Sequence, residues 1–294
     1  MPASFVVAGA TGRVGSVVAS ELLSRGASTT VIVRGNAAAA QWESRGATTA
    51  VGSLGDADFL TRTLQGAGGF FALLPENVPP VDFHGHRRRM ADAMARAVAE
   101  SAVPHVVMLS AIAASLADGN GPAKDLHYLE QLLSSGGARL SILRSCFFQD
   151  NVADAIRPAM GFGIYPNFLP SADAAFPMVA TRDVGRVAAA ALLSPPAHSE
   201  RVLVLGPSYS IGDLSRRLGA ALGKPLQVAD IPPDQHVPTL VKAGVPPPVA
   251  EAVAEMFGAF AKGVIVPEGD RQVIGSTTVD EVIAACLKRA ASIG

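Results

Sequence analysis

Residues 4–15 read SFVVAGATGRVG, and this stretch decides the fold of the chain. Its apolar run ends at Gly9, and a helical pattern follows Gly12 and Gly15. In a dinucleotide site the first glycine permits a sharp turn, the second lets the backbone approach a pyrophosphate, and the third lets the helix pack closely on the strand. The free N–H groups of the new helix then face the phosphates. The stretch therefore predicts a strand, a turn and a helix around a bound dinucleotide.

The alternation of strands and helices continues through the first half of the chain. Strands are expected at residues 29–33, 48–51, 68–74, 105–110 and 139–144, and those at 68–74 and 105–110 have the composition of strands buried on both faces. Helical patterns cover residues 13–25, 37–45, 56–64, 83–101 and 125–134. This spacing predicts an α/β fold, a Rossmann-type doubly wound parallel sheet with its ligand over the carboxyl ends of the strands.

The residue after the second strand indicates which dinucleotide is bound. A dinucleotide fold usually places an acidic residue there to hold the ribose hydroxyls, but this chain has Arg34. A guanidinium suits a 2′-phosphate, which a carboxylate would repel. Arg34, together with Arg13, therefore favours NADPH over NADH. The alternative interpretation is that Arg34 is an exposed surface residue.

The pattern changes beyond Cys146. Residues 158–177 are rich in Pro, Gly and aromatic residues and have no sustained period. Further elements are expected at residues 181–194, 202–205, 210–222, 226–231, 245–262 and 278–290. We expect residues 1–150 to form an NADP(H)-binding Rossmann domain and residues 151–294 to form mainly a smaller C-terminal substrate-binding cap. Residues 180–206 or so should return to the main sheet.

Composition and charge exclude several classes of protein. The formal net charge is −1, which does not suggest nucleic acid or an anionic membrane as a partner. No apolar run approaches the ~18 residues of a membrane helix. A strand follows the N-terminus directly, so no secretory signal is expected. Cys146 and Cys286 are far apart, which fits a reducing cytoplasm and argues against zinc. We expect a soluble cytoplasmic monomer or homodimer that acts on a small molecule.

One cluster of basic residues also attracts notice. His84 and His86 are followed by three arginines, which could suggest a metal or phosphate site. No carboxylate or cysteine pattern accompanies the two histidines. We therefore interpret these residues as a solvated helix start, and we expect no metal site in this chain.

Several segments together resemble the NmrA-like group of atypical short-chain dehydrogenases/reductases, which includes NAD(P)H-dependent quinone reductases and cofactor-sensing regulators. The matching segments are VVAGATGRVG, VIVR, HVVMLSAIAA, ARLSILRSCFFQDN and TRDVGRVAAAALLSPP. The resemblance extends over about residues 4–205. It implies that the first loop and the residue after the second strand bind the cofactor, namely Gly9, Thr11, Gly12, Arg13, Val14, Gly15 and Arg34.

The resemblance also implies which residues lie at the nicotinamide end and at the adenine end of the cofactor. The end of the fourth strand should lie beside the nicotinamide, and it consists of Leu73, Leu74 and Pro75. Family members often have Gly-Asp-Leu after the third strand, but this chain has Gly-Ser-Leu at residues 52–54. Leu54 is therefore the residue expected at the adenine end, and the side-chain contact of the family's aspartate is missing. The substrate-binding residues implied after the sixth strand and in the aromatic-rich region are Phe147, Phe148, Asn151 and Tyr165.

The residues expected to handle protons depart from the ordinary pattern. Ordinary short-chain dehydrogenases use a serine, and a tyrosine followed four residues later by a lysine that lowers the tyrosine pKa. Ser110 lies where the serine is expected, but Leu132 follows Tyr128 at that spacing, and Lys124 precedes it. The candidate catalytic residues are Ser110, Lys124, His127 and Tyr128. The alternatives are a turn former at Ser110, a surface residue at His127 and a packing residue at Tyr128.

The sequence therefore predicts an NADPH-dependent oxidoreductase that transfers hydride to a small planar apolar acceptor, a quinone or an enone. A quinone accepts hydride without a tightly held acid, so the missing Tyr–Lys pairing weakens alcohol dehydrogenase chemistry more than quinone reduction. Two alternatives remain open. One is a non-catalytic NADP(H) redox sensor, and the other is a biosynthetic tailoring enzyme that reduces a ketone or an imine.

Overall fold

A large parallel sheet organises the molecule, as the alternating pattern predicts. The computed structural model describes residues 4–76 and 81–291. Within them eight strands form one sheet in the order β13-β10-β6-β5-β4-β1-β2-β3, and every neighbouring pair is parallel. The strands are β1 (Ser4–Val7), β2 (Ser28–Val33), β3 (Thr48–Val51), β4 (Gly69–Ala72), β5 (His105–Ala111), β6 (Arg139–Ser145), β10 (Glu200–Leu205) and β13 (Arg271–Ile274).

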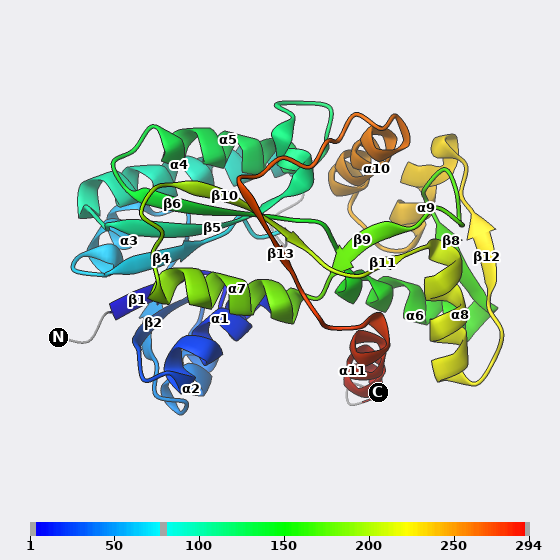
Figure 1. Cartoon of the computed structure of the whole chain (residues 1–294), viewed down its shortest axis with the longest axis horizontal. Coiled ribbons are helices and arrows are strands. Elements are labelled where there is room, and N and C mark those ends of the chain that lie inside the picture. Colours follow the sequence, from blue (N-terminus) through cyan, green and yellow to red (C-terminus); the bar gives the residue numbers. More distant parts are fainter. Residues whose placement is uncertain (1–3, 77–80, 292–294) are drawn as a thin grey trace.

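Helices cover both faces of this sheet (Figure 1). Those on one face are α1 (Arg13–Ser24), α2 (Asn36–Glu43) and α7 (Thr181–Leu193). Those on the other are α3 (Ala57–Leu64), α4 (Phe83–Ser101) and α5 (Ala123–Ser134). Two apolar cores lie between sheet and helices, because the strands bury side chains on both faces. The chain builds outward from β1 to β3 and then from β4 to β6, so the strand order reverses between β1 and β4, where such folds bind their ligand.

The remaining elements form a smaller part beside the carboxyl edge of the sheet (Figure 1). Its helices are α6 (Val152–Phe162), α8 (Ile211–Leu222), α9 (His236–Lys242), α10 (Pro247–Ala261) and α11 (Val279–Ala291), with 3-10 turns η1 (Ile112–Ser115), η2 (Gln149–Asn151) and η3 (Pro233–Gln235) along the chain. Its strands are β7 (Phe147–Phe148), β8 (Ile164–Asn167), β9 (Phe176–Val179), β11 (Ser208–Tyr209) and β12 (Gln227–Asp230). A third apolar core holds α6, α8 and α11 together.

Several elements of the second half were not expected, namely the short strands β7, β8, β9 and β11, the helices α6 and α9, and the edge strand β13. Helix α6 continues through Pro158, although a proline in the helix interior usually ends or kinks a helix. Its buried residues Val152, Ala155 and Ile156 nevertheless have helical spacing. The edge strand β13 was also not expected, because its residues are mostly exposed and form no apolar run. It completes the main sheet beside β10, which lies within the segment expected to return there.

Candidate functional site

The glycine turn after β1 has the geometry that the sequence predicts. Gly9 has a φ of +65°, a conformation that favours glycine, and its carbonyl oxygen accepts a hydrogen bond of 2.8 Å from the Gly12 N–H. A Cβ atom on Gly15 would lie 2.3 Å from that same oxygen. A glycine is therefore required at both positions, one for the turn and one for the close approach of α1 to β1.

The start of α1 is open to a ligand. Thr11, Gly12 and Arg13 are exposed, whereas Val14 and Gly15 are buried beneath them. Gly12 occupies the N-cap position and offers no side chain to the first turn. The N–H groups of that turn have no partner within the helix, so they and the helix dipole favour an anionic group such as a pyrophosphate.

Arg34 lies at the carboxyl end of β2 and is exposed. Within the described part of the chain it makes no hydrogen bond or ion pair, so its guanidinium remains available to a phosphate. The half-buried Leu54 follows β3 and packs on the apolar core below α3 and α4. Arg13 is directed elsewhere, because its Nη1 donates a 3.3 Å hydrogen bond to the carbonyl oxygen of Asp150.

The segment after β4 packs against the start of the glycine turn. Leu73 packs directly on Gly9, since a Cβ atom there would lie 2.7 Å from Leu73 Cδ2. The next carbonyl oxygens are held by Arg87 of α4, whose Nη1 lies 3.4 Å from Leu74 O and 2.9 Å from Pro75 O. Arg87 is 1% exposed, so the expectation of a solvated helix start is wrong for this residue.

Ser110 lies at the end of β5, but its hydroxyl is engaged. It is buried, and its Oγ donates a 2.5 Å hydrogen bond to Oε1 of Glu130 on α5. Arg144 of β6 holds the same carboxylate with both Nε and Nη2, at 3.1 and 2.7 Å. These contacts join α5, β5 and β6, and they give Ser110 a structural partner.

The other three candidate catalytic side chains leave α5 in different directions. Lys124 Nζ lies 3.5 Å from Asp118 and 3.8 Å from Glu255 of α10. His127 Nδ1 lies 2.9 Å from the carbonyl oxygen of Ala114 in η1. Both therefore face the region between the sheet edge and α10.

Tyr128 lies on the side of α5 that faces α4. Its hydroxyl donates a 2.7 Å hydrogen bond to Asp92 of α4, and this bond raises the pKa of Tyr128. A catalytic tyrosine in this class of enzyme needs the opposite shift. The structure therefore does not bring Ser110, Lys124 and Tyr128 together.

Aromatic side chains connect the segment after β6 to α10. The ring centroid of Phe147 lies 4.4 Å from that of Phe260 and 5.1 Å from that of Phe176. Phe148 packs on the core of the main sheet, and Asn151 is exposed. Tyr165 lies instead in the core of the smaller part, where burial raises its pKa.

Helix α10 connects the two parts of the molecule. A Cβ atom on Gly121 would lie 2.0 Å from Ala252 O, so the helix rests directly on the backbone before α5. Oε2 of Glu255 accepts a 3.2 Å hydrogen bond from the Gly121 N–H, and Ala252 packs on Phe83 of α4. The triple proline predicts the start of this helix, but no feature of the sequence indicates that it reaches the sheet edge.

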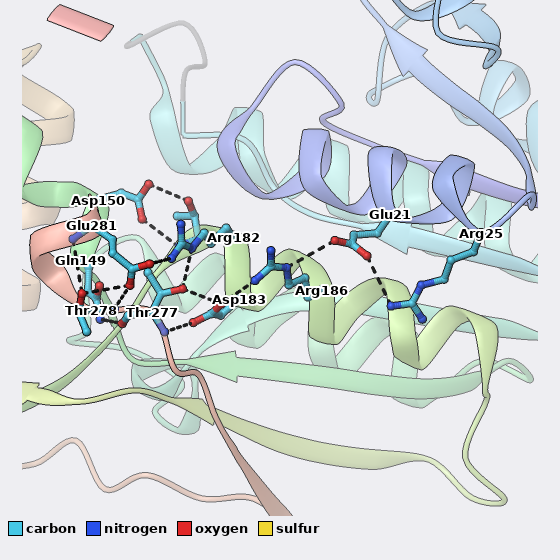
Figure 2. Close-up of polar contacts among 11 residues, drawn as sticks. Glu21, Arg25, Gln149, Asp150, Arg182, Asp183, Arg186, Thr277, Thr278 and Glu281 are labelled. Atoms are coloured by element: carbon cyan, nitrogen blue, oxygen red, sulfur yellow. Dashed lines mark hydrogen bonds and ion pairs between the residues drawn. The ribbon is translucent and has the colours of Figure 1, made fainter. Parts of the chain in front are cut away.

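A polar network fixes the segment after β6 (Figure 2). Asp150 accepts hydrogen bonds of 2.8 Å from both the N–H and the hydroxyl of Thr181, the first residue of α7. Asp183 binds Thr277 in the same way, at 2.9 and 2.8 Å. Gln149 donates hydrogen bonds to the carbonyl oxygens of Met178 and Thr277. Sequence reasoning missed these residues. Thr181 and Asp183 are in the first turn of α7, and their side chains bind Asp150 and Thr277 instead of capping the helix.

A pocket of about 800 Å³ lies beside the turn, and Arg13 links the two. Apolar side chains of α6 and three arginines line it, and the arginines are Arg13, Arg157 and Arg289. Among the described residues, no group of three or more His, Cys, Asp or Glu side chains could hold a metal ion. No described helix has the length and apolar character needed to cross a membrane.

Comparison with known proteins supports the same interpretation of the fold. The model of the NmrA-like family matches residues 2–286. An NAD(P)H azoreductase from Xenophilus azovorans is 27% identical over 256 residues, which are 86% of this chain and 85% of that protein.

Two solved structures show the same fold at lower identity. The triphenylmethane reductase of Citrobacter sp. complexed with NADP(H) is 18% identical with a TM-score of 0.81, over 96% of this chain and 99% of the other. The NADPH-dependent quinone oxidoreductase of Escherichia coli complexed with NADPH is 19% identical with a TM-score of 0.75, over the same shares of both chains.

Proposed function

The chain belongs to the NmrA-like family, and on that basis we propose that it is an NADPH-dependent reductase. It transfers hydride to a small planar apolar acceptor, a quinone or an enone. When bound, the reduced nicotinamide supplies that hydride.

The fit of the cofactor to this chain is the observation that carries the proposal. The exposed first turn of α1 offers N–H groups to the pyrophosphate, and the close approach at Gly15 leaves no room for a side chain beneath it. Arg34 offers an unpaired cation to the 2′-phosphate. Leu73 and Pro75 border the nicotinamide end. The named relatives use NAD(P)H or NADPH, which agrees with this assignment.

The aromatic side chains between β7 and α10 favour a flat, apolar acceptor. Phe147, Phe176 and Phe260 offer ring faces and edges where the smaller part meets the carboxyl edge of the sheet. The relatives named for azo compounds, triphenylmethane dyes and quinones all act on conjugated acceptors. Acceptors of this kind take up hydride without the Tyr–Lys pairing that an alcohol dehydrogenase needs.

The proposal is tested by mixing the purified protein with NADPH and a panel of quinones and enones. The absorbance of the reduced cofactor should fall with at least one acceptor, and the rate should increase with acceptor concentration. Parallel reactions without protein or without acceptor give the background. A protein that binds NADPH but consumes it with no acceptor would refute the reductase activity.

A second candidate function is cofactor sensing without catalysis. The contacts that engage Ser110 and Tyr128 favour it, because neither hydroxyl is free to act on a substrate. This function predicts NADP(H) binding and altered association with a partner protein, with no turnover. A tailoring ketone or imine reductase needs a dedicated proton donor, and the hydrogen bond of Tyr128 to Asp92 does not favour Tyr128 in that role.

A further inference from the structure

A histidine and a buried carboxylate meet between the first turns of α4 and α5. Nδ1 of His84 lies 2.8 Å from Oδ2 of Asp125. Asp125 is fully buried, whereas the side chain of His84 is 30% exposed. A carboxylate at this distance accepts a hydrogen bond from Nδ1 and so orients the ring, with Nε2 on the side away from Asp125.

Arginines share the same carboxylate. Arg87 Nε lies 3.0 Å from Oδ2 of Asp125, and Arg88 Nε lies 3.5 Å from Oδ1. Glu76 is the other charged group that acts on Arg87. Asp125 therefore balances a buried guanidinium and orients His84 at the same time, and this explains why a lone carboxylate is retained at a fully buried position.

The location of this pair connects it to the proposed active site. Through Arg87, Asp125 is joined to the carbonyl oxygens of Leu74 and Pro75, which follow β4. On the other side, Phe83 packs against Ala252 of α10 and its ring contacts the ring of His84. The pair thus lies beside the segment that follows β4 and beside α10, near the place where the acceptor is proposed to bind.

The other proton-bearing side chains near this edge are less suited to act as the acid. Ser110 donates its hydrogen to Glu130, and Lys124 has two carboxylate neighbours. His127 Nδ1 lies against the backbone carbonyl oxygen of Ala114, and among the described residues no carboxylate orients its ring. His84 has the carboxylate partner, and within the described part of the chain its Nε2 makes no hydrogen bond.

We infer that His84, oriented by Asp125, donates the proton that the acceptor needs when it is reduced. This inference rests on the proposed reductase activity. The hydride brings two electrons and one hydrogen to the acceptor and leaves a negative charge on its oxygen or nitrogen. His84 Nε2 gives its proton to that atom, and the neutral ring then takes a proton from water through its exposed side.

The test compares two acceptors that differ in their need for a proton. A neutral enone or azo compound must gain a proton along with the hydride, whereas a cationic triarylmethane dye becomes neutral on gaining hydride alone. His84→Gln should lower kcat with the neutral acceptor roughly 100- to 10,000-fold and change the rate with the dye less than about 2-fold. The matched control is His86→Gln. His86 lies two residues after His84 in α4 but does not contact Asp125, so this substitution should leave both rates unchanged.

A second measurement follows the unmodified protein without turnover. Diethyl pyrocarbonate labels a free histidine Nε2, and mass spectrometry reports the rate at each site. NADP⁺ together with a quinone forms a complex that cannot react, and this complex should slow the labelling of His84. The exposed His198 serves as the internal reference and should be labelled at the same rate throughout. This result does not depend on whether a substitution disturbs folding.

The results that would contradict these expectations separate the role of His84 from the reductase activity. Equal loss of both activities in His84→Gln, or an unchanged rate with the neutral acceptor, overturns the role of His84 and leaves the reductase activity standing. A wild-type protein that reduces only the dye, or labelling of His84 that the quinone complex does not slow, also overturns it. A wild-type protein that reduces no acceptor overturns the reductase proposal and this inference with it.

Discussion

Replacing Arg34 with alanine tests the assignment of the cofactor most directly. Arg34 is exposed and makes no ion pair within the described residues, so its removal should change the free energy of unfolding by less than ~0.5 kcal/mol. The whole effect should then appear in cofactor binding. A charge-assisted hydrogen bond contributes about 1.5–3 kcal/mol, and each 1.4 kcal/mol changes Kd tenfold, so NADPH binding should weaken roughly 10- to 150-fold.

The measurement is a fluorescence titration of the protein with NADPH and separately with NADH. NADH lacks the 2′-phosphate, so its Kd should change little in Arg34→Ala. Because the contact is exposed, the loss for NADPH should shrink as ionic strength rises. Arg25→Ala removes the same charge from the far end of α1 and should leave both affinities unchanged. Equal weakening of NADPH and NADH in Arg34→Ala would refute the 2′-phosphate assignment.

Three further predictions concern the framework of the site. Gly15→Ala should lower the melting temperature and NADPH affinity together, because its Cβ atom would lie 2.3 Å from Gly9 O. Arg144→Met leaves Glu130 buried without its cation, so urea unfolding should show a loss of about 3–5 kcal/mol. Burial lowers the pKa of His105 to about 4, so the unfolded chain binds the extra proton first as pH falls. Stability should decrease from pH 6.5 to 4 by roughly 3 kcal/mol more in the wild type than in His105→Leu.

Matched substitutions provide the controls for these predictions. Gly137 has open space around it, so Gly137→Ala should not change NADPH affinity. Arg271→Met breaks an ion pair with Glu200 that is exposed on the arginine side, and the loss should stay below about 1 kcal/mol. A similar loss for Arg144→Met and Arg271→Met would contradict the importance of burial. A parallel pH dependence for wild type and His105→Leu would contradict the assigned shift.

Much of the fold followed from local patterns in the sequence. The sequence correctly predicted the elements from β1 to β6, because helices with clear apolar spacing alternate there with short segments that favour strands. The glycine spacing in residues 4–15 predicted the turn for the steric reasons that the structure shows. Helix α6 and strand β13 were missed, since a proline interrupts one and the other has no apolar run.

The site depended more on contacts between distant residues. The sequence by itself determined the glycine turn and the position of Arg34, since both follow directly from strand ends. Only the tertiary structure decided that Tyr128 faces Asp92 and that Asp125 reaches His84, which is 41 residues away along the chain. The direction of a side chain on α5 is set by the helices and loops that pack around it. Local sequence preferences do not encode those neighbours, so the side chains that can handle protons are identified only from the folded structure.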